Sequence, residues 1–220
     1  MQSSPLSRST RRRWAALALG LVVSLGGCNV LANLGYVLNG DDVPADFDKL
    51  NNKRVAIVCR PVEELQFSDR TAAPDLAAAV GQLLKANGRK IQIISPSDVR
   101  QWCDERDWHE FPEVGKGVKA DMVVGIDLEG FSLNQGQTLY QGKADVNVAV
   151  YDMKEGGKKV WGQSLPRTVF PPNSSLPITD RPQAEFRAQF IKVIAERIAR
   201  NFYSHDAQAD FASDASALNN

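Results

Sequence analysis

The segment RVAIVC at residues 54–59 constrains the fold of this chain more strongly than any other feature. After Arg54 it holds five apolar residues in a row, three of which are β-branched. A short continuous apolar run of this kind is typical of a strand buried on both faces, as in the sheets of α/β proteins. We therefore expect other elements to cover both sides of this strand.

Helix and strand patterns alternate after this strand. Residues 71–88 predict a helix, with Thr71 near its start, Asn87-Gly88 at its end, and one apolar face formed by Leu76, Val80, Leu83 and Leu84. KIQIIS at residues 90–95 predicts a second strand. Ser95-Pro96-Ser97-Asp98 then resembles a capping box, which predicts the start of a second helix.

The second half of the chain predicts a meander and a closing helix. Residues 120–133, 138–153 and 160–165 have strand patterns, and the glycines of KEGGKK allow a tight turn before the last of them. Apolar side chains then recur every four residues at Phe186, Phe190, Ile194, Ile198 and Phe202. The predicted fold is α/β: a single domain over residues 53–204, with a mixed sheet of parallel first strands plus an antiparallel meander, packed helices and a long C-terminal helix.

The N-terminus has the three parts of a secretory signal. Basic residues end at Arg11-Arg12-Arg13, residues 14–25 are apolar, and small residues lead to Cys28. The apolar run is shorter than the ~20 residues that span a membrane. Leu25-Gly26-Gly27-Cys28 resembles the lipobox of bacterial lipoproteins, which implies removal of residues 1–27 and acylation of Cys28. A plain signal peptide or an uncleaved anchor is the alternative, and the arginines leave twin-arginine export open beside the general secretory route.

The remaining boundaries follow from composition. Residues 28–52 predict a flexible tether, because Gly, Asn and Asp are scattered through them, and residues 205–220 predict a disordered tail. The resulting expectation is a domain that is lipid-anchored to a membrane of the cell envelope and faces the periplasm.

Charge bears on the class of partner. The chain has 26 basic and 26 acidic residues, and four arginines precede Cys28, so the chain from Cys28 onward carries a net charge of −4. Phosphate recognition needs a concentrated basic face, and no basic run follows Cys28. We therefore expect no nucleic-acid partner.

Two cysteines remain after Cys28. Cys59 ends the first predicted strand and Cys103 lies on the second predicted helix. An oxidising compartment permits a disulfide between them, whereas two isolated buried thiols are the alternative. The sequence leaves both open, because a disulfide requires Cα atoms within ~7 Å.

The order of elements resembles a group of periplasmic lipoproteins around the curli-secretion protein CsgG and the penicillin-binding-protein activator LpoB, a fold shared with the TolB N-terminal domain. RVAIVC, SDVRQWCDERD, KADMVVGIDLEG and VNVAVYDMKEGGKKVWGQS carry the resemblance, which covers residues 53–164. Gly125 lies one place earlier than the glycine of that group. The resemblance implies action by docking onto other envelope proteins and no catalytic residues.

Catalytic and metal-binding patterns are weak throughout the sequence. No serine lies in a G-x-S-x-G elbow, and Gly115-Lys116-Gly117 lacks the phosphate-binding frame and predicts a turn. His109 lies in DWHE, where two carboxylates and an imidazole could bind a metal, but consecutive side chains point in different directions. An exposed loop is the better interpretation. We expect no catalytic residues, no metal and no cofactor.

RQWCDERDWHEF mixes aromatic and charged residues in a way that is enriched at binding hot spots. Trp102, Trp108 and Phe111 are therefore candidate partner contacts, although packing of the same rings on the sheet is the simpler alternative.

The predicted function is that of a membrane-anchored envelope lipoprotein, a non-catalytic accessory, assembly or regulatory factor that docks onto an envelope protein. A small-ligand sensor and an envelope hydrolase are the alternatives.

Overall fold

The structure is a computed structural model that describes residues 42–62 and 69–206. The predicted leader, Cys28 and most of the predicted tether and tail lie outside these residues. No helix within the described ranges is long and apolar enough to cross a membrane.

The core of the domain is a mixed sheet with the strand order β3-β2-β4-β5-β6. β2 runs parallel to β3 and β4, whereas β4, β5 and β6 are antiparallel neighbours. The strands are β2 (Arg54–Pro61), β3 (Gln92–Ile93), β4 (Met122–Gln135), β5 (Leu139–Asp152) and β6 (Lys158–Ser164). This arrangement confirms the predicted mixed sheet, with parallel first strands and an antiparallel meander.

Shorter strands extend this framework. β7 (Thr168–Phe170) and β8 (Leu176–Pro177) pair with β5 beyond the end of β6, and the Phe170–Pro171 peptide bond is cis. β1 (Asp42–Val43) pairs with β9 (His205–Asp206) in a separate two-stranded sheet. Residues 205 and 206, predicted to be tail, therefore form a strand in the described structure.

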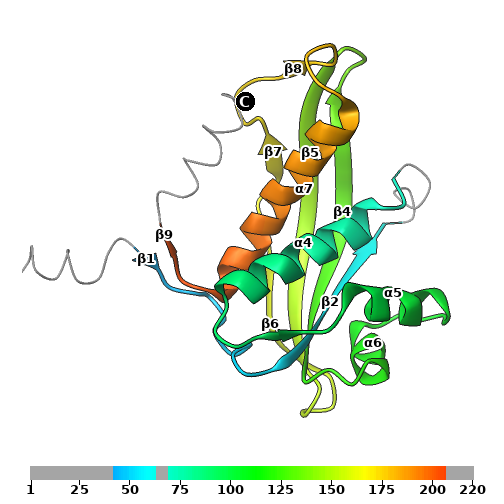
Figure 1. The fold of residues 1–220 in the computed structure, drawn as a ribbon, viewed down its shortest axis with the longest axis vertical. Helices are drawn as coiled ribbons and strands as arrows, with labels where there is room; N and C mark the ends of the chain where they lie inside the picture. Colours follow the sequence, from blue (N-terminus) through cyan, green and yellow to red (C-terminus); the bar gives the residue numbers. More distant parts are fainter. Residues whose placement is uncertain (1–41, 63–68, 207–220) are drawn as a thin grey trace, which may run out of the picture. The chain divides into compact units, whose positions relative to one another are not determined.

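Helices cover both faces of β2. Figure 1 shows α4 (Ala72–Asn87) and α7 (Gln183–Ala199) lying across one face of the sheet. Val55 and Ile57 belong to the main core with these helices, whereas Ala56 and Val58 belong to a second core cluster with residues of α5 (Pro96–Asp104) and α6 (Phe111–Gly117). Alternate residues of a strand point to opposite faces, so β2 is buried on both, as its sequence predicts.

The packed domain begins earlier than residue 53. Phe47 is 6% exposed and Leu50 is fully buried, and both belong to the main core. The ring of Phe47 lies 6.1 Å from Trp161 and 6.4 Å from Phe202. The predicted tether boundary at residue 52 was therefore wrong, because these two apolar residues were assigned to a polar linker on its average composition.

The β4–β5 hairpin continues past the end of β2 and extends the main core. Its inner side meets α7 through stacked rings: the ring centroids are 4.9 Å apart for Tyr140 and Phe186, and 5.4 Å apart for Phe131 and Phe190. Phe170 lies between the two helix phenylalanines, 5.9 Å from Phe186 and 6.4 Å from Phe190. The regular phenylalanine spacing of α7 is thus a core stripe, as predicted.

Two helix predictions need correction. The stretch 111–117, read as a loop and a turn, forms α6, where Pro112 occupies the first turn. The capping box lies at the start of this helix, formed by Glu110 and Glu113, and not at Ser95, whose side chain makes no capping hydrogen bond. The Ser95 hydroxyl instead lies 2.5 Å from that of Ser97.

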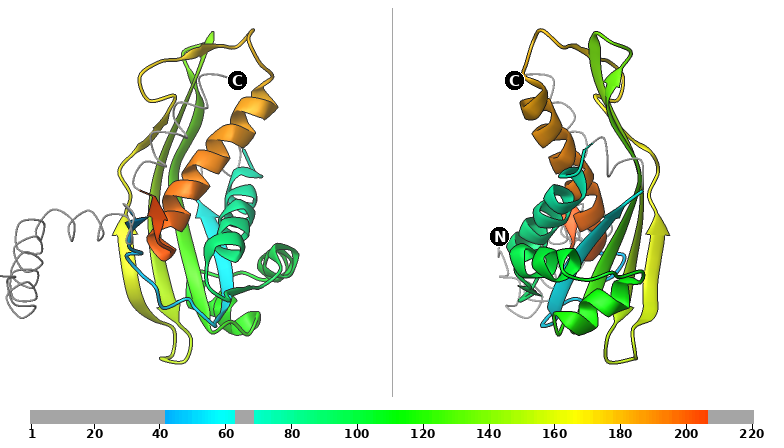
Figure 2. Two further views of the ribbon diagram at one scale, coloured as in Figure 1. Left: turned by 60° about the vertical axis from the view of Figure 1, so that its left-hand side comes forward. Right: turned by 90° about the vertical axis from the view of Figure 1, so that its right-hand side faces the viewer.

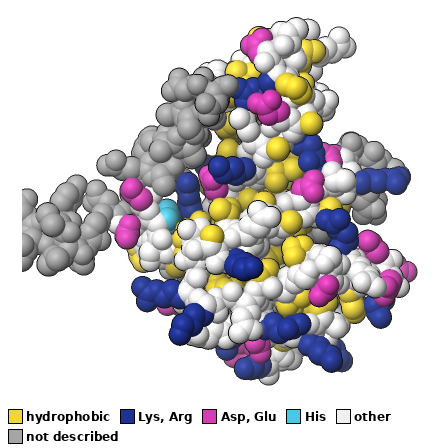
Figure 3. All heavy atoms as spheres, viewed as in Figure 1, with side chains coloured by type: hydrophobic (Ala, Val, Ile, Leu, Met, Phe, Trp, Pro, Cys, Tyr) yellow, Lys and Arg dark blue, Asp and Glu magenta, His cyan; other side chains and the backbone are white. Residues whose placement is uncertain are grey.

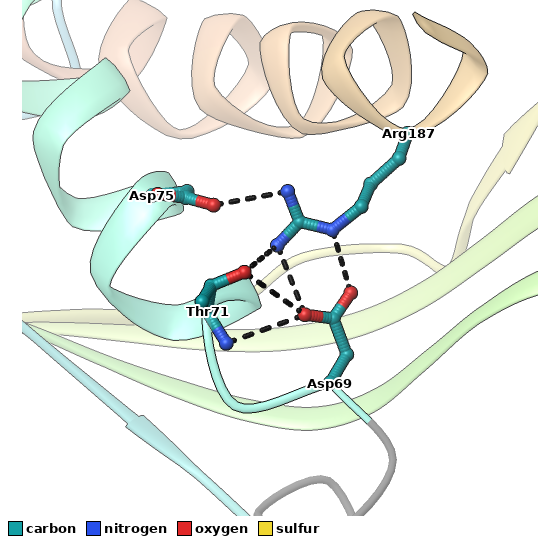
Figure 4. A network of polar contacts seen from close by, with 4 residues as sticks. All are labelled: Asp69, Thr71, Asp75 and Arg187. Carbon is teal, nitrogen blue, oxygen red and sulfur yellow. Dashed lines mark hydrogen bonds and ion pairs between the residues drawn. The ribbon is translucent and has the colours of Figure 1, made fainter. Parts of the chain in front are cut away.

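A polar network joins the two helices of the main layer (Figure 4). Arg187 of α7 donates from Nε to Asp69 Oδ2 at 2.6 Å and from Nη1 to Asp75 Oδ2 at 2.9 Å, and its Nη2 donates to Thr71 Oγ1 at 2.7 Å. The Arg187 side chain is 20% exposed. This network fixes the start of α4 against α7 at the edge of the buried residues Ala72 and Phe186.

Candidate docking surface

The sheet exposes a polar surface on the face opposite α4 and α7. Val124, Ile126 and Leu128 of β4 belong to the main core, so Asp127 lies on the other face. Asp127 pairs in register with Arg60 of β2 and with Asn147 of β5, and Asn147 pairs with Ser164 of β6. A polar row therefore crosses four strands. We call six residues the polar sheet face: Arg60, Asp127, Glu129, Asp145, Asn147 and Arg167.

The side chains of the polar sheet face are paired with one another. Arg60 Nε lies 2.8 Å from Asp127 Oδ1. Arg167, in the connection between β6 and β7, holds Asp145 with two hydrogen bonds of 2.8 Å each, and the Asn147 amide donates to Glu129. Bidentate arginine–carboxylate pairs fix the geometry of both groups. The strands thus present a preformed pattern of charges.

Aromatic residues flank this surface. Phe111, at the start of α6, lies over Gly125 on β4, and its ring is 5.8 Å from Tyr151 and 5.9 Å from Trp108. The guanidinium of Arg60 lies 4.8 Å from the centre of the Phe111 ring and donates to the carbonyl of His109 at 2.6 Å. Arg60 therefore links the polar sheet face to the loop that carries Trp108.

Two hollows adjoin Asp127. One, of about 770 Å³, is lined by Arg60, Pro61, Val62, Trp108, His109, Asp127 and Glu129. The other, of about 370 Å³, has a floor of small residues at Ala149 and Gly162 and reaches Tyr151 and Lys159. β6 is an edge strand, because it pairs with β5 alone among the described strands. Figure 2 (right) shows it in yellow, on the side of the domain away from α4 and α7.

The predicted contact residues separate in the structure. Phe111 is 1% exposed and belongs to the second core cluster, so its candidacy as a surface contact was wrong; its apolar ring is used to cover the sheet. Trp102 is half-buried against Gly117, with the Arg106 guanidinium 5.2 Å from its ring centre. Trp108 is also half-buried, and it lines the larger hollow. Of the three, Trp108 is the one beside the polar sheet face.

The two described cysteines are free thiols. Cys59 packs against the main core and Cys103 against the second cluster, on opposite faces of the sheet. Burial raises the pKa of the Cys103 thiol to about 11, with a further contribution from Asp104. Burial, with a smaller effect of Asp127, also raises the pKa of the Cys59 thiol well above its ordinary range. The possible disulfide is thus not formed in this structure.

The titratable groups with shifted pKa values keep their ordinary protonation states at neutral pH. Hydrogen bonds from Arg167 lower the pKa of Asp145, against a smaller effect of burial. Burial, with smaller effects of neighbouring charges, raises the pKa of Tyr151 above its ordinary value of 10. No group of three or more His, Cys, Asp or Glu residues in the described ranges could hold a metal ion. The exposed side chain of His109 lies in a loop, as predicted.

The polar sheet face was missed at the sequence level. Its signal is present in DLE and DVN, where charged or amide residues alternate with core residues of β4 and β5. Such alternation predicts one uncovered face. The partners Arg60 and Arg167 lie 67 and 22 residues from their carboxylates, so their pairing depends on the tertiary structure.

No protein-family model matches this chain, and no curated protein sequence matches it. A PelC dodecamer from Paraburkholderia phytofirmans is similar with a TM-score of 0.44 and 14% identity, over 74% of this chain and 95% of that chain. The lipoprotein GNA1162 from Neisseria meningitidis has a TM-score of 0.39 and 11% identity, over 66% and 97%. A minor lipoprotein from Acinetobacter baumannii has a TM-score of 0.37 and 14% identity, over 73% and 94%. All three TM-scores lie below 0.5, so these similarities establish neither a family nor a function for this chain.

Proposed function

We propose that this chain is a lipid-anchored protein of the bacterial envelope that acts without catalysis, by docking onto another envelope protein through the polar sheet face. The observation that carries the proposal is a set of preformed charge pairs whose carboxylates lie on strands, Arg60 with Asp127 and Arg167 with Asp145, beside the half-buried Trp108. Arginine and tryptophan dominate binding energy at protein interfaces, and complementary charges give them specificity. The partner would present charged groups in the opposite order.

The chemistry of the described side chains supports a non-catalytic role. A general acid or base works best with a pKa near the ambient pH, and a nucleophilic cysteine works as a thiolate. The shifted pKa values lie further from neutral pH than the ordinary values. Hydrogen bonds from Arg167 lower the pKa of Asp145, and burial raises the pKa of Cys103 to about 11. These shifts favour fixed charges and inert thiols.

The anchor belongs to the same proposal. Acylation of Cys28 would confine the domain to a membrane surface, and such confinement raises the effective concentration for a second contact. The resemblance to the CsgG, LpoB and TolB N-terminal group also remains part of the proposal, because it concerns a docking role.

Site-specific photo-crosslinking in cells tests the docking role. A photoreactive residue at Trp108 or Ser164 samples the two ends of the polar row, and one at Lys192, on the outer side of α7, serves as the matched control. The proposal expects the same protein product from both test positions, none from the control, and loss of the product in Arg167→Glu. Products that are the same at all three positions, or that survive Arg167→Glu, would contradict it.

The hollow of about 770 Å³ favours a second candidate, a small-ligand sensor, since ligand sites commonly have this size. It is less well supported, because the polar groups that would orient a ligand, Arg60 and Asp127, already bind each other. Thermal stabilisation by a metabolite panel, lost in Trp108→Ala, would favour the sensor over the docking role.

A further inference from the structure

The chain gathers basic residues at one end of the sheet. β2, β3 and β4 all begin there, and the β5–β6 turn lies beside them, because Arg54 pairs with Gln92, Val55 with Met122 and Met122 with Asp152. The segments at this end are residues 48–54, 89–90, 116–121 and 152–159, which we call the basic end. They hold ten Lys or Arg residues and four Asp or Glu residues, a net charge of +6.

Most cations of the basic end have no carboxylate partner among the described residues. Lys154 lies 3.6 Å from Asp121, and Lys158 lies 3.8 Å from Glu155. Seven cations of the basic end form no ion pair within the described structure: Lys49, Lys53, Arg89, Lys90, Lys116, Lys119 and Lys159. Figure 3 shows Lys and Arg side chains along the lower edge of the face in view.

The backbone at this end is unusual as well. Within the described ranges, the non-glycine residues with positive φ are Asn52 (58°), Lys90 (54°) and Lys119 (56°), and each precedes one of the three parallel strands. The left-handed conformation is uncommon for lysine and free of strain for glycine. Two tight turns that glycine would fit best therefore carry exposed lysines.

The rest of the chain is acidic. From Cys28 onward the net charge is −4, so the residues outside the basic end together carry −10. A domain with this asymmetry turns its basic end toward an anionic surface, while the remainder is repelled. No basic run follows Cys28 in the sequence, but four segments far apart in the sequence together build a basic face.

We propose that the basic end docks the anchored domain onto a membrane surface that carries anionic phospholipid headgroups. The proposal rests on the proposed function for the lipid anchor. Four separate segments supply the cations at an end of the domain, which suits a laterally extended charged surface. Each Lys or Arg near such a surface contributes about 1 kcal/mol, or roughly a fivefold change in the ratio of docked to undocked domain.

The sequence sets an upper limit on the distance between the predicted anchor and the described domain. Asp42 is fourteen residues after Cys28, a distance of at most about 50 Å for an extended chain. Trp102 lines a hollow together with Val118 and Lys119 of the basic end, and its ring is covered by Gly117 and contacted by the guanidinium of Arg106. Stacking of nucleic-acid bases needs accessible aromatic faces. A lipid surface therefore fits the basic end better than a single strand of nucleic acid.

Lysine footprinting of the full acylated chain in vesicles tests the proposal. Vesicles of phosphatidylcholine alone are compared with vesicles that contain one-third phosphatidylglycerol, and amine acetylation of each lysine is read by mass spectrometry. We expect protection of Lys53, Lys90, Lys119 and Lys158 by the anionic vesicles, lost at high salt, and none of Lys143 or Lys192. Equal acetylation in both kinds of vesicle would overturn the proposal.

A variant pair separates charge from folding. Lys90→Gly/Lys119→Gly removes two charges at positions where glycine fits the backbone, so the thermal midpoint is not expected to fall, while the ratio of docked to undocked domain falls on the order of 20-fold. Lys143→Gln/Lys192→Gln removes the same charge elsewhere and is expected to leave docking unchanged. Equal losses in both variants would overturn the proposal.

The outcomes also distinguish a failure of the proposed role of the basic end from a failure of the proposed lipid anchor. A chain that fails to float with neutral vesicles contradicts acylation of Cys28, whereas the role of the basic end is read from the difference between the two lipids and between the variants. Protection by an oligonucleotide and not by anionic vesicles would overturn the membrane assignment in favour of a nucleic-acid partner.

Discussion

The ring of Phe111 lies directly over Gly125: a Cβ atom at Gly125 would be 2.6 Å from Cγ of Phe111. Phe111 is 1% exposed, and its ring fills the space that a larger β4 residue would occupy. This contact holds α6 on the sheet beside Arg60 and Trp108. The absence of a side chain at Gly125 therefore positions the loop next to the polar sheet face.

Gly125→Ala is expected to destabilise the domain. The added methyl group forces the Phe111 ring or α6 to move, and overpacking of a close contact costs about 1–3 kcal/mol. Urea denaturation followed by tryptophan fluorescence measures this change. Phe111→Leu relieves the clash, so the double variant is expected to be less destabilised than the sum of the two single variants. Simple additivity would show that Gly125 acts through something other than this ring.

The main elements of the fold were predictable because their signals are local. The apolar run of β2, the four-residue spacing of phenylalanines in α7, and the glycines before β6 each determine one element by their own pattern. Gly156 and Gly157 have φ angles of 73° and 84°, as the predicted turn requires. The mixed sheet follows from these elements and their order.

The features that the sequence did not predict depend on contacts between distant segments. α6 is seven residues long and contains two glycines, so its sequence predicts a turn, and its packing on Gly125 stabilises the helix. The polar sheet face and the basic end both join segments that are separated in the sequence. Phe47 and Leu50 were missed because a short apolar pair inside a polar stretch gives no periodic pattern.

Arg187→Met is expected to lower the free energy of unfolding by about 2 kcal/mol, because it leaves Asp69 and Asp75 without their charged donor. Urea denaturation at neutral pH measures the loss. Arg100→Met is the matched control, since Arg100 is exposed on α5 and makes no ion pair within the described structure. Equal effects of the two substitutions would contradict a structural role for the network.

The same network predicts acid sensitivity. Burial acts to raise the pKa of Asp69, but hydrogen bonds and charge from Arg187 outweigh it and lower the pKa below the ordinary value of 3.8. A lowered folded-state pKa contributes stability above the ordinary value, and this contribution is lost as the pH falls from about 5 through the folded value. Asp69→Asn is therefore expected to flatten the pH dependence of the urea midpoint in this range. An unchanged slope would show that other carboxyl groups dominate acid unfolding.

The thiols give a prediction independent of the docking surface. Burial raises the pKa of Cys103 to about 11 and that of Cys59 further, so both are thiols at neutral pH. Alkylation of the native, unreduced protein is expected to be at least about tenfold slower than in denaturant. In denaturant without reductant, Cys59 and Cys103 should both react. Absence of these two reactions would show that the cysteines are bridged.

Arg167→Glu is expected to abolish docking without affecting folding. Its side chain is 64% exposed, and exposed ion pairs contribute little to stability, so the thermal midpoint should not change. The charge reversal, however, breaks the pattern on the polar sheet face and should remove the crosslinked product from Trp108. A product that persists at wild-type yield would place the docking surface elsewhere.

Metabolic labelling with palmitate, compared between the wild-type chain and Cys28→Ser, tests whether Cys28 carries the lipid anchor. We expect label on the wild-type chain that is lost in Cys28→Ser, together with release of the variant from membranes by a high-salt wash, because the basic end alone binds through screened charges. Label that persists in Cys28→Ser, or a wild-type chain without label, would contradict a lipid anchor at Cys28.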